Sequence, residues 1–344
     1  MRIDEVHDDA LQALLTQGVS QQLFSGAAAA VSIDGRRQFA CAGTHAFGDS
    51  TAVGPQSLFD LASVTKTFTA AAIVRLAVAG EIELDADVSE LLEIGGGAKG
   101  ITVRQLLTHT AGLPAESGAW HDSAVQPEAR ASTVLSAPLL DPPGSVHRYS
   151  CVGYIAAGVV AERVTGAPLS ELLRETVLDP LSLGSIGFGP VDRTRAVATE
   201  EQPWVGRAML RGEVHDELSW YLGGKTGNAG LFATADDVLS FAESLIDDRL
   251  FNDEARRLLT VNALTSRHRA PYGQALGARI GDRDIVGDRQ VLCHPGFTGT
   301  MWLADPEQKV AAVLLTNRVH PHRDRVDLGD FRRRFSSTVL GAPR

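Results

Sequence analysis

Ser63 and Lys66 are the residues whose types and spacing first suggest chemistry, because side chains three positions apart share one face of a helix. The following segment 69–79 is apolar and stops before Gly80, which predicts a buried helix that opens at Ser63. A serine hydroxyl becomes a nucleophile when a base takes its proton, and a lysine whose pKa is lowered by burial or a second cation can be that base. The Ser63 amide at the helix start could also donate to an oxyanion. The pair therefore predicts acyl transfer through an ester on Ser63.

The same two residues also have a purely structural interpretation. Serine often begins a helix because its hydroxyl accepts a hydrogen bond from a backbone amide, and an exposed lysine needs no function. An isolated Ser-x-x-Lys spacing is more often such a helix start than a catalytic pair. Other motifs have to decide between the two interpretations.

Tyr149 is a candidate for proton transfer to and from the serine. It follows the Pro/Gly-rich loop 141–144 and precedes a helical pattern, and loops on rigid elements often carry catalytic groups. A phenol poised between cations can take a proton from a serine and return it to the leaving group. The alternative is a tyrosine packed at a helix start with its hydroxyl bonded to the backbone.

A third candidate segment is 293–300, which directly precedes a strand pattern. Gly296 at the start of an edge strand would let an acyl substrate lie against the backbone, and the amide of Phe297 would complete an oxyanion hole. His294 would line the same cleft. By itself, His294 could equally be a loop histidine beside a proline turn.

In their order along the chain, these segments resemble the motifs of the serine β-lactamase-like superfamily, which contains class C β-lactamases, D,D-peptidases and esterases. The resemblance covers nearly the whole length, and the motifs are specific because they occur together. The matching segments are Ser63-Val64-Thr65-Lys66, 101–114, Tyr149-Ser150-Cys151-Val152-Gly153-Tyr154, 230–237, 294–300 and 314–318. The segment that begins with His294 is similar to the His-x-Gly variant of the family's Lys-Thr-Gly motif.

The resemblance implies an α/β (α+β) fold, in which a five-stranded antiparallel sheet flanked by helices is joined to a helical domain and the site lies in the cleft between them. It implies an acyl-enzyme on Ser63, with Lys66 and Tyr149 sharing the proton transfers; which of the two is the base stays open. The residues that it implies at the oxyanion and the substrate are Phe297, His294, Gly296 and Cys151.

Cys151 is a departure from the family pattern. The family's Tyr-x-Asn motif is here Tyr149-Ser150-Cys151, so a thiol replaces the side-chain amide that usually contacts the acyl amide of a β-lactam or a peptide. Because a thiol is a weak hydrogen-bond partner, we expect simple esters or a specialised acyl donor to be preferred. In a competing interpretation Cys151 is itself the nucleophile, but no paired histidine is apparent in the sequence.

Two other features resemble active-site motifs in the wrong context. The sequence Lys225-Thr226-Gly227 has the letters of the family's Lys-Thr-Gly motif, but it precedes a helical pattern, so we expect it to lie away from the cleft-edge strand. It also lacks the residue spacing of a phosphate-binding loop, which disfavours nucleotide binding. His109 lies in a block that the resemblance marks as a structural turn after a helix, not as part of a Ser-His-Asp triad. No histidine pair has metal-ligand spacing, and we expect neither metal nor cofactor.

The acceptor of the acyl group decides the reaction and is not given by the sequence. Water would make the protein an esterase or amidase, and an amine or alcohol would make it a transacylase. The alternatives are a true β-lactamase or D,D-peptidase, or a non-catalytic β-lactam-binding or acyl-binding protein on the same fold. Retention of Ser63, Lys66 and Tyr149 together disfavours the binding protein.

The composition excludes several other classes. The 344 residues are 44% hydrophobic and 22% charged, as in an ordinary globular protein. A net charge of -10 provides no electrostatic footprint for nucleic acid, and no apolar run is long enough to span a membrane. Segment 1–9 is acidic and unlike an export signal, so we expect a cytoplasmic protein whose partner is a small acyl substrate.

The elements that must position these residues follow from periodicity and turn residues. Asp34-Gly35 between two short apolar runs predicts a hairpin over 27–42, and a second hairpin is expected over 300–316. Helices are expected at both ends, over 4–17 and 326–340, and the region between the hairpins is mainly helical. The expected internal helices cover 102–108, 154–164, 169–177 and 235–245. We therefore predict a discontinuous α/β domain, 1–62 and 220–344, around a mainly helical domain, 63–219.

Overall fold

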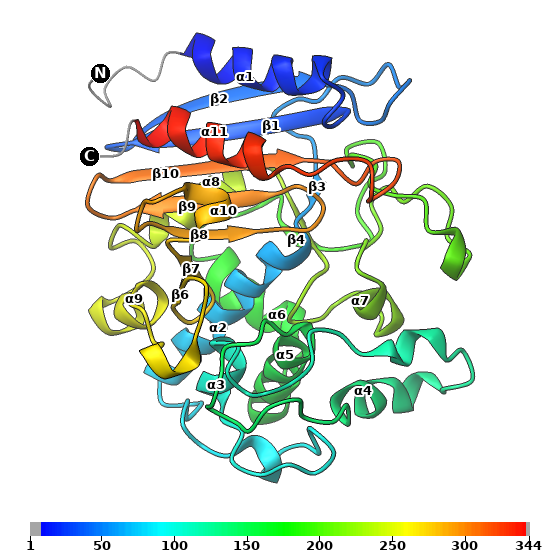
Figure 1. Ribbon diagram of the computed structural model, residues 1–344, viewed down its shortest axis with the longest axis vertical. Coiled ribbons are helices and arrows are strands. Elements are labelled where there is room, and N and C mark those ends of the chain that lie inside the picture. The colour runs from blue at the N-terminus through cyan, green and yellow to red at the C-terminus, as the bar shows by residue number, and fades with distance from the viewer. Residues whose placement is uncertain (1–7, 342–344) are drawn as a thin grey trace.

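An antiparallel sheet built from both ends of the chain is the framework of the fold (Figure 1). The computed structural model describes residues 8–341. In spatial order the strands are β2 (Arg36–Gly43), β1 (Gly26–Ile33), β10 (Val310–Thr316), β9 (Met301–Asp305), β8 (Leu292–Pro295), β7 (Arg279–Ile280) and β6 (Gly273–Gln274). Because β1 pairs with both β2 and β10, the two predicted hairpins meet in the middle of one sheet.

The expected five-stranded sheet is present and is extended at one edge. Strands β2, β1, β10, β9 and β8 form it, and β7 and β6 continue it beyond β8 with two residues each. Two-residue strands carry too little alternation to be visible in the sequence. They matter for the site because β7 pairs with β8, which carries His294.

Both faces of the sheet are buried, and β1 shows why. Its side chains alternate: Ala27, Ala29 and Val31 belong to one buried cluster, while Ala28 and Ala30 belong to the other. The short alanine side chains allow helices to approach closely on either side. The helices α1 (Asp8–Ser20) and α11 (Gly329–Leu340) lie side by side over one face, and α8 (Ala235–Ser244) covers the other (Figure 1).

The terminal helices agree with the sequence patterns, with shifted ends. The N-terminal helix continues to Ser20, three residues beyond the expected end, and residues 4–7 of the expected helix lie outside the described residues. The C-terminal helix begins at Gly329, three residues later than expected.

The remaining helices lie below the sheet in Figure 1, except α10, which packs against α11. They are α2 (Thr65–Val78), α3 (Val103–Leu107), α4 (Pro127–Leu135), α5 (Cys151–Thr165), α6 (Leu169–Leu173), α7 (Glu217–Tyr221), α9 (Asp253–Thr260) and α10 (Arg283–Val286). Helix α5 begins three residues earlier than its apolar pattern, because the Ser150 hydroxyl accepts from the Gly153 amide and caps it. A second small sheet, β3 (Phe59–Asp60), β5 (Leu231–Ala233) and β4 (Gly187–Phe188), lies beside the segment that leads to Ser63.

One buried cluster connects the sheet with the helices below it. It contains Trp302 and Val313 from the sheet, Phe68 from α2 and Val160 from α5. The division of the chain into an α/β domain, 1–62 and 220–344, and a mainly helical domain, 63–219, stays a prediction. The buried cluster spans both regions and does not test where the boundaries lie. None of the helices formed by residues 8–341 is long and apolar enough to cross a membrane.

A buried ion network ties the segment after β10 to the rest of the molecule. Glu200 is fully buried; its Oε2 lies 2.7 Å from His215 Nε2 and 2.6 Å from Arg323 Nη2. Burial alone would raise the pKa of Glu200, but its bonds to His215 and Arg323 lower that pKa to about 2. The ionised carboxylate is therefore part of the folded state.

We expect Glu200→Gln to destabilise the fold at pH 7 by about 1 to 3 kcal/mol, because the amide leaves buried donors poorly paired. The folded pKa lies below the ordinary value of 4.5, so this stabilisation is present above about pH 4.5 and is lost as the pH falls toward 2. The difference in melting temperature between the wild type and the variant, measured by circular dichroism from pH 7 to pH 3, should therefore become smaller as the pH falls. A constant difference across this range would contradict the assignment.

Candidate active site

Ser63 lies in a tight turn just before α2. The turn, Ala62–Val64, is a 3-10 helix, and the α-helix begins at Thr65, so Ser63 precedes the α-helix that was expected to open with it. Ala62 has φ +46°, a left-handed conformation that is strained for a residue with a side chain. The half-buried Ser63 is thus presented by a constrained backbone.

Lys66 is fully buried one turn further on. Its Nζ lies 2.9 Å from Ser63 Oγ, 3.0 Å from the carbonyl oxygen of Asn228 and 3.4 Å from Cys151 Sγ. Burial alone would lower the pKa of Lys66, but its interactions with Cys151 and Tyr149 raise it above the ordinary value. These neighbours oppose the lowering of the Lys66 pKa that burial alone would cause, so burial does not by itself make Lys66 the base.

Tyr149 faces the same ammonium group. Its ring centroid lies 5.0 Å from Lys66 Nζ and 4.5 Å from the ring of His109. The backbone on both sides of Tyr149 is held by His109, whose carbonyl accepts from the Arg148 amide at 2.8 Å and whose Nδ1 accepts from the Ser150 amide at 3.1 Å. Tyr149 is thus fixed at the start of α5, beside Lys66.

His109 has this structural place in the turn after α3. It is buried with φ +57°, and burial, followed by the charge of His147, holds its pKa well below the ordinary value. The neutral ring can therefore accept the Ser150 amide hydrogen. No contact joins His109 to Ser63 within residues 8–341, which agrees with a turn and not with a triad.

The turn between β8 and β9 is hydrogen-bonded to the residues before Ser63. Thr298 Oγ1 donates to the Asp60 carbonyl at 2.7 Å, and Thr300 Oγ1 donates to the Leu61 carbonyl at 3.0 Å. In the part of the chain that is described, neither the Ser63 amide nor the Phe297 amide has a protein acceptor. Two free backbone amides are thus held in fixed relation, as an oxyanion hole requires.

Gly296 occupies the tightest point of this turn. Its amide donates to the Thr300 carbonyl at 2.7 Å, and a Cβ at this position would lie 2.0 Å from Thr300 Oγ1 and 2.6 Å from the Leu61 carbonyl oxygen. Only glycine fits there without moving the turn.

His294 is buried in β8 on the sheet side of the site. Its ring centroid lies 6.5 Å from that of Tyr149, and its Nδ1 lies 2.9 Å from the Pro295 carbonyl. Burial, then the charges of Arg279 and Lys66, keeps the pKa of His294 well below the ordinary value. The ring is neutral, and because Nδ1 must donate to the carbonyl, Nε2 is the free acceptor.

Cys151 is the first residue of α5 and points its thiol at Lys66. Burial raises the pKa of Cys151 above the ordinary value, although the charge of Lys66 lowers it. A protonated thiol is a poor nucleophile, which disfavours the interpretation of Cys151 as the attacking group.

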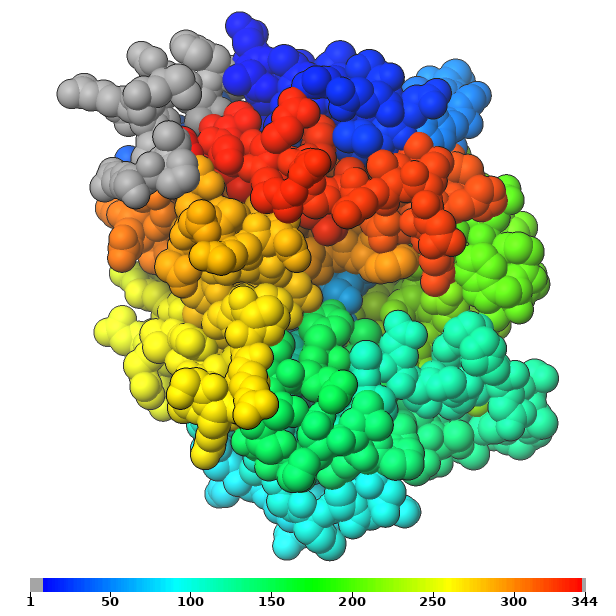
Figure 2. Space-filling view, viewed as in Figure 1, coloured from blue at the N-terminus to red at the C-terminus, as the bar shows by residue number. Residues whose placement is uncertain are grey.

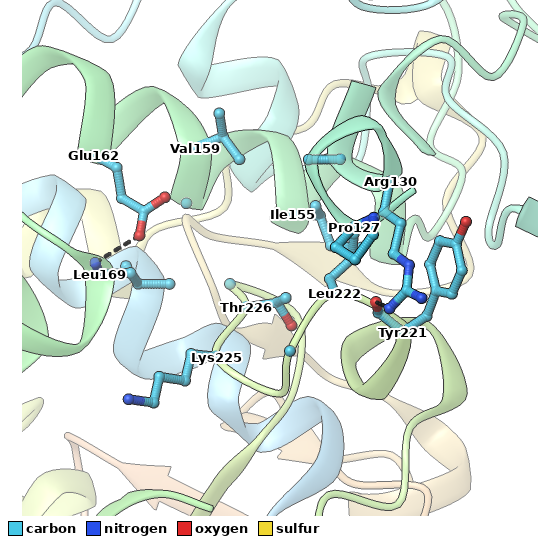
Figure 3. A pocket seen from close by; sticks show the side chains of 14 residues that line it. Pro127, Arg130, Ile155, Val159, Glu162, Leu169, Tyr221, Leu222, Lys225 and Thr226 are labelled. Carbon is cyan, nitrogen blue, oxygen red and sulfur yellow. Dashed lines mark hydrogen bonds between the residues drawn. The ribbon is translucent and has the colours of Figure 1, made fainter. Parts of the chain in front are cut away.

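The literal Lys225-Thr226-Gly227 lies away from the β8 edge. Figure 3 shows Lys225 among the residues that line a cavity of about 270 Å³, with Arg130 of α4 and Val159 of α5. The segment is followed by the three-residue strand β5 and then by α8. The sequence showed only the helical pattern, because a strand this short gives none, and β5 belongs to the small sheet and not to the sheet that contains β8. The same loop nevertheless contributes the Asn228 carbonyl that accepts from Lys66.

Several residues that shape the site were missed by sequence reasoning. The Asp60 carboxylate accepts the Ala62 amide and the His215 amide, each at 2.7 Å, and thereby holds the turn before Ser63. Arg332 of α11 donates to the Gly296 carbonyl at 2.7 Å. Asp60 is close enough to Ser63 to have drawn attention, whereas no local pattern marks Arg332.

The surface is hollowed at this place. Figure 2 shows a recess between the orange and red C-terminal segments and the green segments, and blue surface, the colour of the chain near residue 60, is visible in it. Among residues 8–341, no group of three or more His, Cys, Asp or Glu side chains could hold a metal ion.

A family model described as Beta-lactamase matches residues 11–335. The chain belongs to this family. It is 28% identical over 307 residues to an Escherichia coli K12 protein named "Putative D-alanyl-D-alanine carboxypeptidase", covering 77% of this chain and 70% of that protein. The fold is that of the β-lactamases and transpeptidases, an antiparallel sheet flanked by helices with an added helical region.

Two solved structures show how far this fold extends. EstCE1, described as a hydrolase with promiscuous acyltransferase activity, has a TM-score of 0.80 at 22% identity, covering 98% of this chain and 100% of that one. The simvastatin synthase LovD of Aspergillus terreus has a TM-score of 0.74 at 20% identity, covering 96% of each chain. This chain is a serine hydrolase of the β-lactamase family.

We expect Gly296→Ala to slow reaction at Ser63 by about 100-fold, because the added Cβ displaces the turn that carries the Phe297 amide. The rate of Ser63 labelling by a fluorophosphonate probe measures this without assuming a substrate. Gly184→Ala is the matched control, because a Cβ there has no heavy atom within 4 Å. Equal labelling rates for the two variants would show that the turn does not hold an oxyanion amide.

Proposed function

We propose that the protein hydrolyses or transfers a small acyl group through an acyl-enzyme on Ser63, acting as an esterase or amidase or as a transacylase. The observation that carries the proposal is the 2.9 Å contact between Ser63 Oγ and the buried Lys66 ammonium group, together with the backbone amides of Ser63 and Phe297, which have no protein acceptor within residues 8–341. A nucleophile, a cation and an oxyanion hole are the parts that acyl transfer requires.

The contacts of Lys66 indicate which roles Lys66 and Tyr149 take in the proton transfers. An ammonium group has three N–H donors, and Lys66 has three acceptors within 3.4 Å. In the proposed mechanism Lys66 therefore stabilises the developing Ser63 alkoxide, and the phenolate form of Tyr149 accepts the hydroxyl proton and becomes a phenol. As the tetrahedral intermediate collapses, Tyr149 returns this proton to the leaving group, while the amides of Ser63 and Phe297 hold the oxyanion.

The acyl side of the site supports esters over β-lactams and peptides. The family's asparagine amide could bind an acyl amide, but Cys151 offers a thiol that already contacts Lys66. The fold similarity to EstCE1 and LovD supports an acyltransferase as well as a hydrolase.

The region beside the Phe297 amide is aromatic. Phe297 and Trp204 are 46% and 50% exposed, and the guanidinium of Arg323 lies 5.5 Å and 4.7 Å from their ring centroids. Such a surface would accept an apolar or aromatic leaving group or acceptor. An aromatic ester is therefore the first substrate to test.

We expect p-nitrophenyl esters of short acids to be hydrolysed by the wild type and at least about 1,000-fold more slowly by Ser63→Ala, because removal of the nucleophile removes the acyl-enzyme route. Release of p-nitrophenol, with mass spectrometry of the acylated protein, measures both steps. A faster release on addition of an amine or alcohol acceptor would support transacylation over hydrolysis.

Parallel assays with nitrocefin and an N-acylated D-alanyl-D-alanine dipeptide distinguish the alternatives. Rapid Ser63-dependent nitrocefin cleavage would make the protein a β-lactamase, and release of D-alanine would make it a D,D-peptidase, as the name of the E. coli relative suggests. Stoichiometric acylation without turnover would instead favour a binding protein.

We expect Cys151→Asn to increase the rate for nitrocefin or the dipeptide relative to the ester by about tenfold, because it restores an amide that can bind the acyl amide. The ratio of kcat/KM values measures this, and Cys151→Ser is the control because a hydroxyl of similar size adds no amide. An unchanged ratio would show that Cys151 does not set the preference.

A further inference from the structure

Arg279 enters the candidate site from the sheet edge that extends beyond β8. It is the first residue of β7 and pairs with Cys293, the neighbour of His294. Its side chain is 17% exposed. No sequence pattern pointed to it, because β7 has two residues and only the pairing with β8 brings Arg279 to the cleft.

The guanidinium of Arg279 is fixed between two aromatic rings. It lies 5.2 Å from the ring centroid of Tyr149 and 4.7 Å from that of Tyr272. Its Nη1 also donates to Asp282 Oδ2 at 2.8 Å, and Asp282 is itself buried at the start of α10. A planar cation held by an ion pair and two rings has little freedom to turn.

The ring of Tyr272 is in the state that suits this contact. Burial raises the pKa of Tyr272 to about 12, although Arg279 lowers it, so its phenol is neutral at pH 7. Burial lowers the pKa of Arg279, but Tyr272, Tyr149 and Asp282 outweigh this effect and raise it. Arg279 therefore remains a cation under all assay conditions.

Tyr149 depends on such contacts for the orientation of its side chain. Its neighbouring backbone amides are hydrogen-bonded to His109, and its hydroxyl interacts with the Lys66 ammonium group. The ring lies near Lys66, His109, His294 and Arg279. Of these, His294 and Arg279 belong to the sheet; His294 is neutral, so Arg279 is the cation that the sheet presents to the ring.

We infer that Arg279 is a positioning residue, which holds the Tyr149 phenol at Ser63 from the sheet side of the cleft. The inference rests on the proposed function, in which Tyr149 moves the proton of Ser63. The inference gives the short strand β7 a role, because β7 carries Arg279, and Arg279 would fix Tyr149 of the helical region.

The test uses Arg279→Met and Arg279→Lys, each alone and combined with Tyr149→Phe. We expect both single variants to lower kcat for a neutral p-nitrophenyl ester, and the Ser63 labelling rate by a fluorophosphonate, about tenfold with little change in KM. Arg279→Lys keeps the charge beside Asp282 but loses the planar guanidinium, so it tests stacking even if Arg279→Met folds poorly. Arg36→Met, at an exposed arginine of β2, is the control and should have wild-type rates.

The combination with Tyr149→Phe is decisive, because a residue that acts through the phenol has no further effect once the hydroxyl is absent. We expect the Arg279 substitutions to slow the Tyr149→Phe enzyme by less than twofold. An equal tenfold loss in that background would overturn the inference, as would a rise in KM confined to substrates with a free carboxylate, which would make Arg279 a substrate-binding group.

The two failures can be told apart. Wild-type labelling at Ser63 without turnover of any ester or amide would contradict the proposed function alone. Unchanged labelling rates in both Arg279 variants, with wild-type melting temperatures, would contradict the positioning role alone.

Discussion

The buried ammonium group of Lys66 is the constraint on which the rest of the site depends. A charge without access to water is costly unless polar atoms surround it, and here these atoms are supplied by Ser63, Cys151 and the Asn228 carbonyl. They come from three separate segments of the chain, so the ammonium group is stabilised only when all three are in place. The same contacts that stabilise the charge also direct it at the serine oxygen.

A second constraint acts across the cleft. The hydroxyls of Thr298 and Thr300 bind the carbonyls of Asp60 and Leu61, and Gly296 leaves no space for a side chain between them. The free amides of Ser63 and Phe297 are thereby held by the fold before any substrate binds. Preorganised donors of this kind stabilise a transition state without reorganisation during the reaction, which explains why so many buried contacts converge on two short turns.

The charges of the site are unevenly placed. Lys66 and Arg279 are cations 5.0 Å and 5.2 Å from the Tyr149 ring centroid, whereas His294 and Cys151, which border the substrate in the family pattern, are neutral. Two cations therefore lie beside the tyrosine that moves the serine proton in the proposed mechanism, while the two side chains that border the substrate carry no charge. In the proposed function the acyl group would therefore be bound by shape complementarity, by weak contacts and by the aromatic surface near Phe297 and Trp204, and not by charge.

The sequence by itself determined the two hairpins, the terminal helices and the identity of the central residues, because turn residues, periodicity and the Ser-x-x-Lys spacing are local. The tertiary structure decided the raised pKa of Lys66, the neutral state of His294 and the contact of Arg279 with Tyr149. It also decided the extension of the sheet by β7 and β6, which have two residues each. These properties depend on burial and on neighbours that are distant in sequence, and such neighbours leave no periodic pattern in the chain.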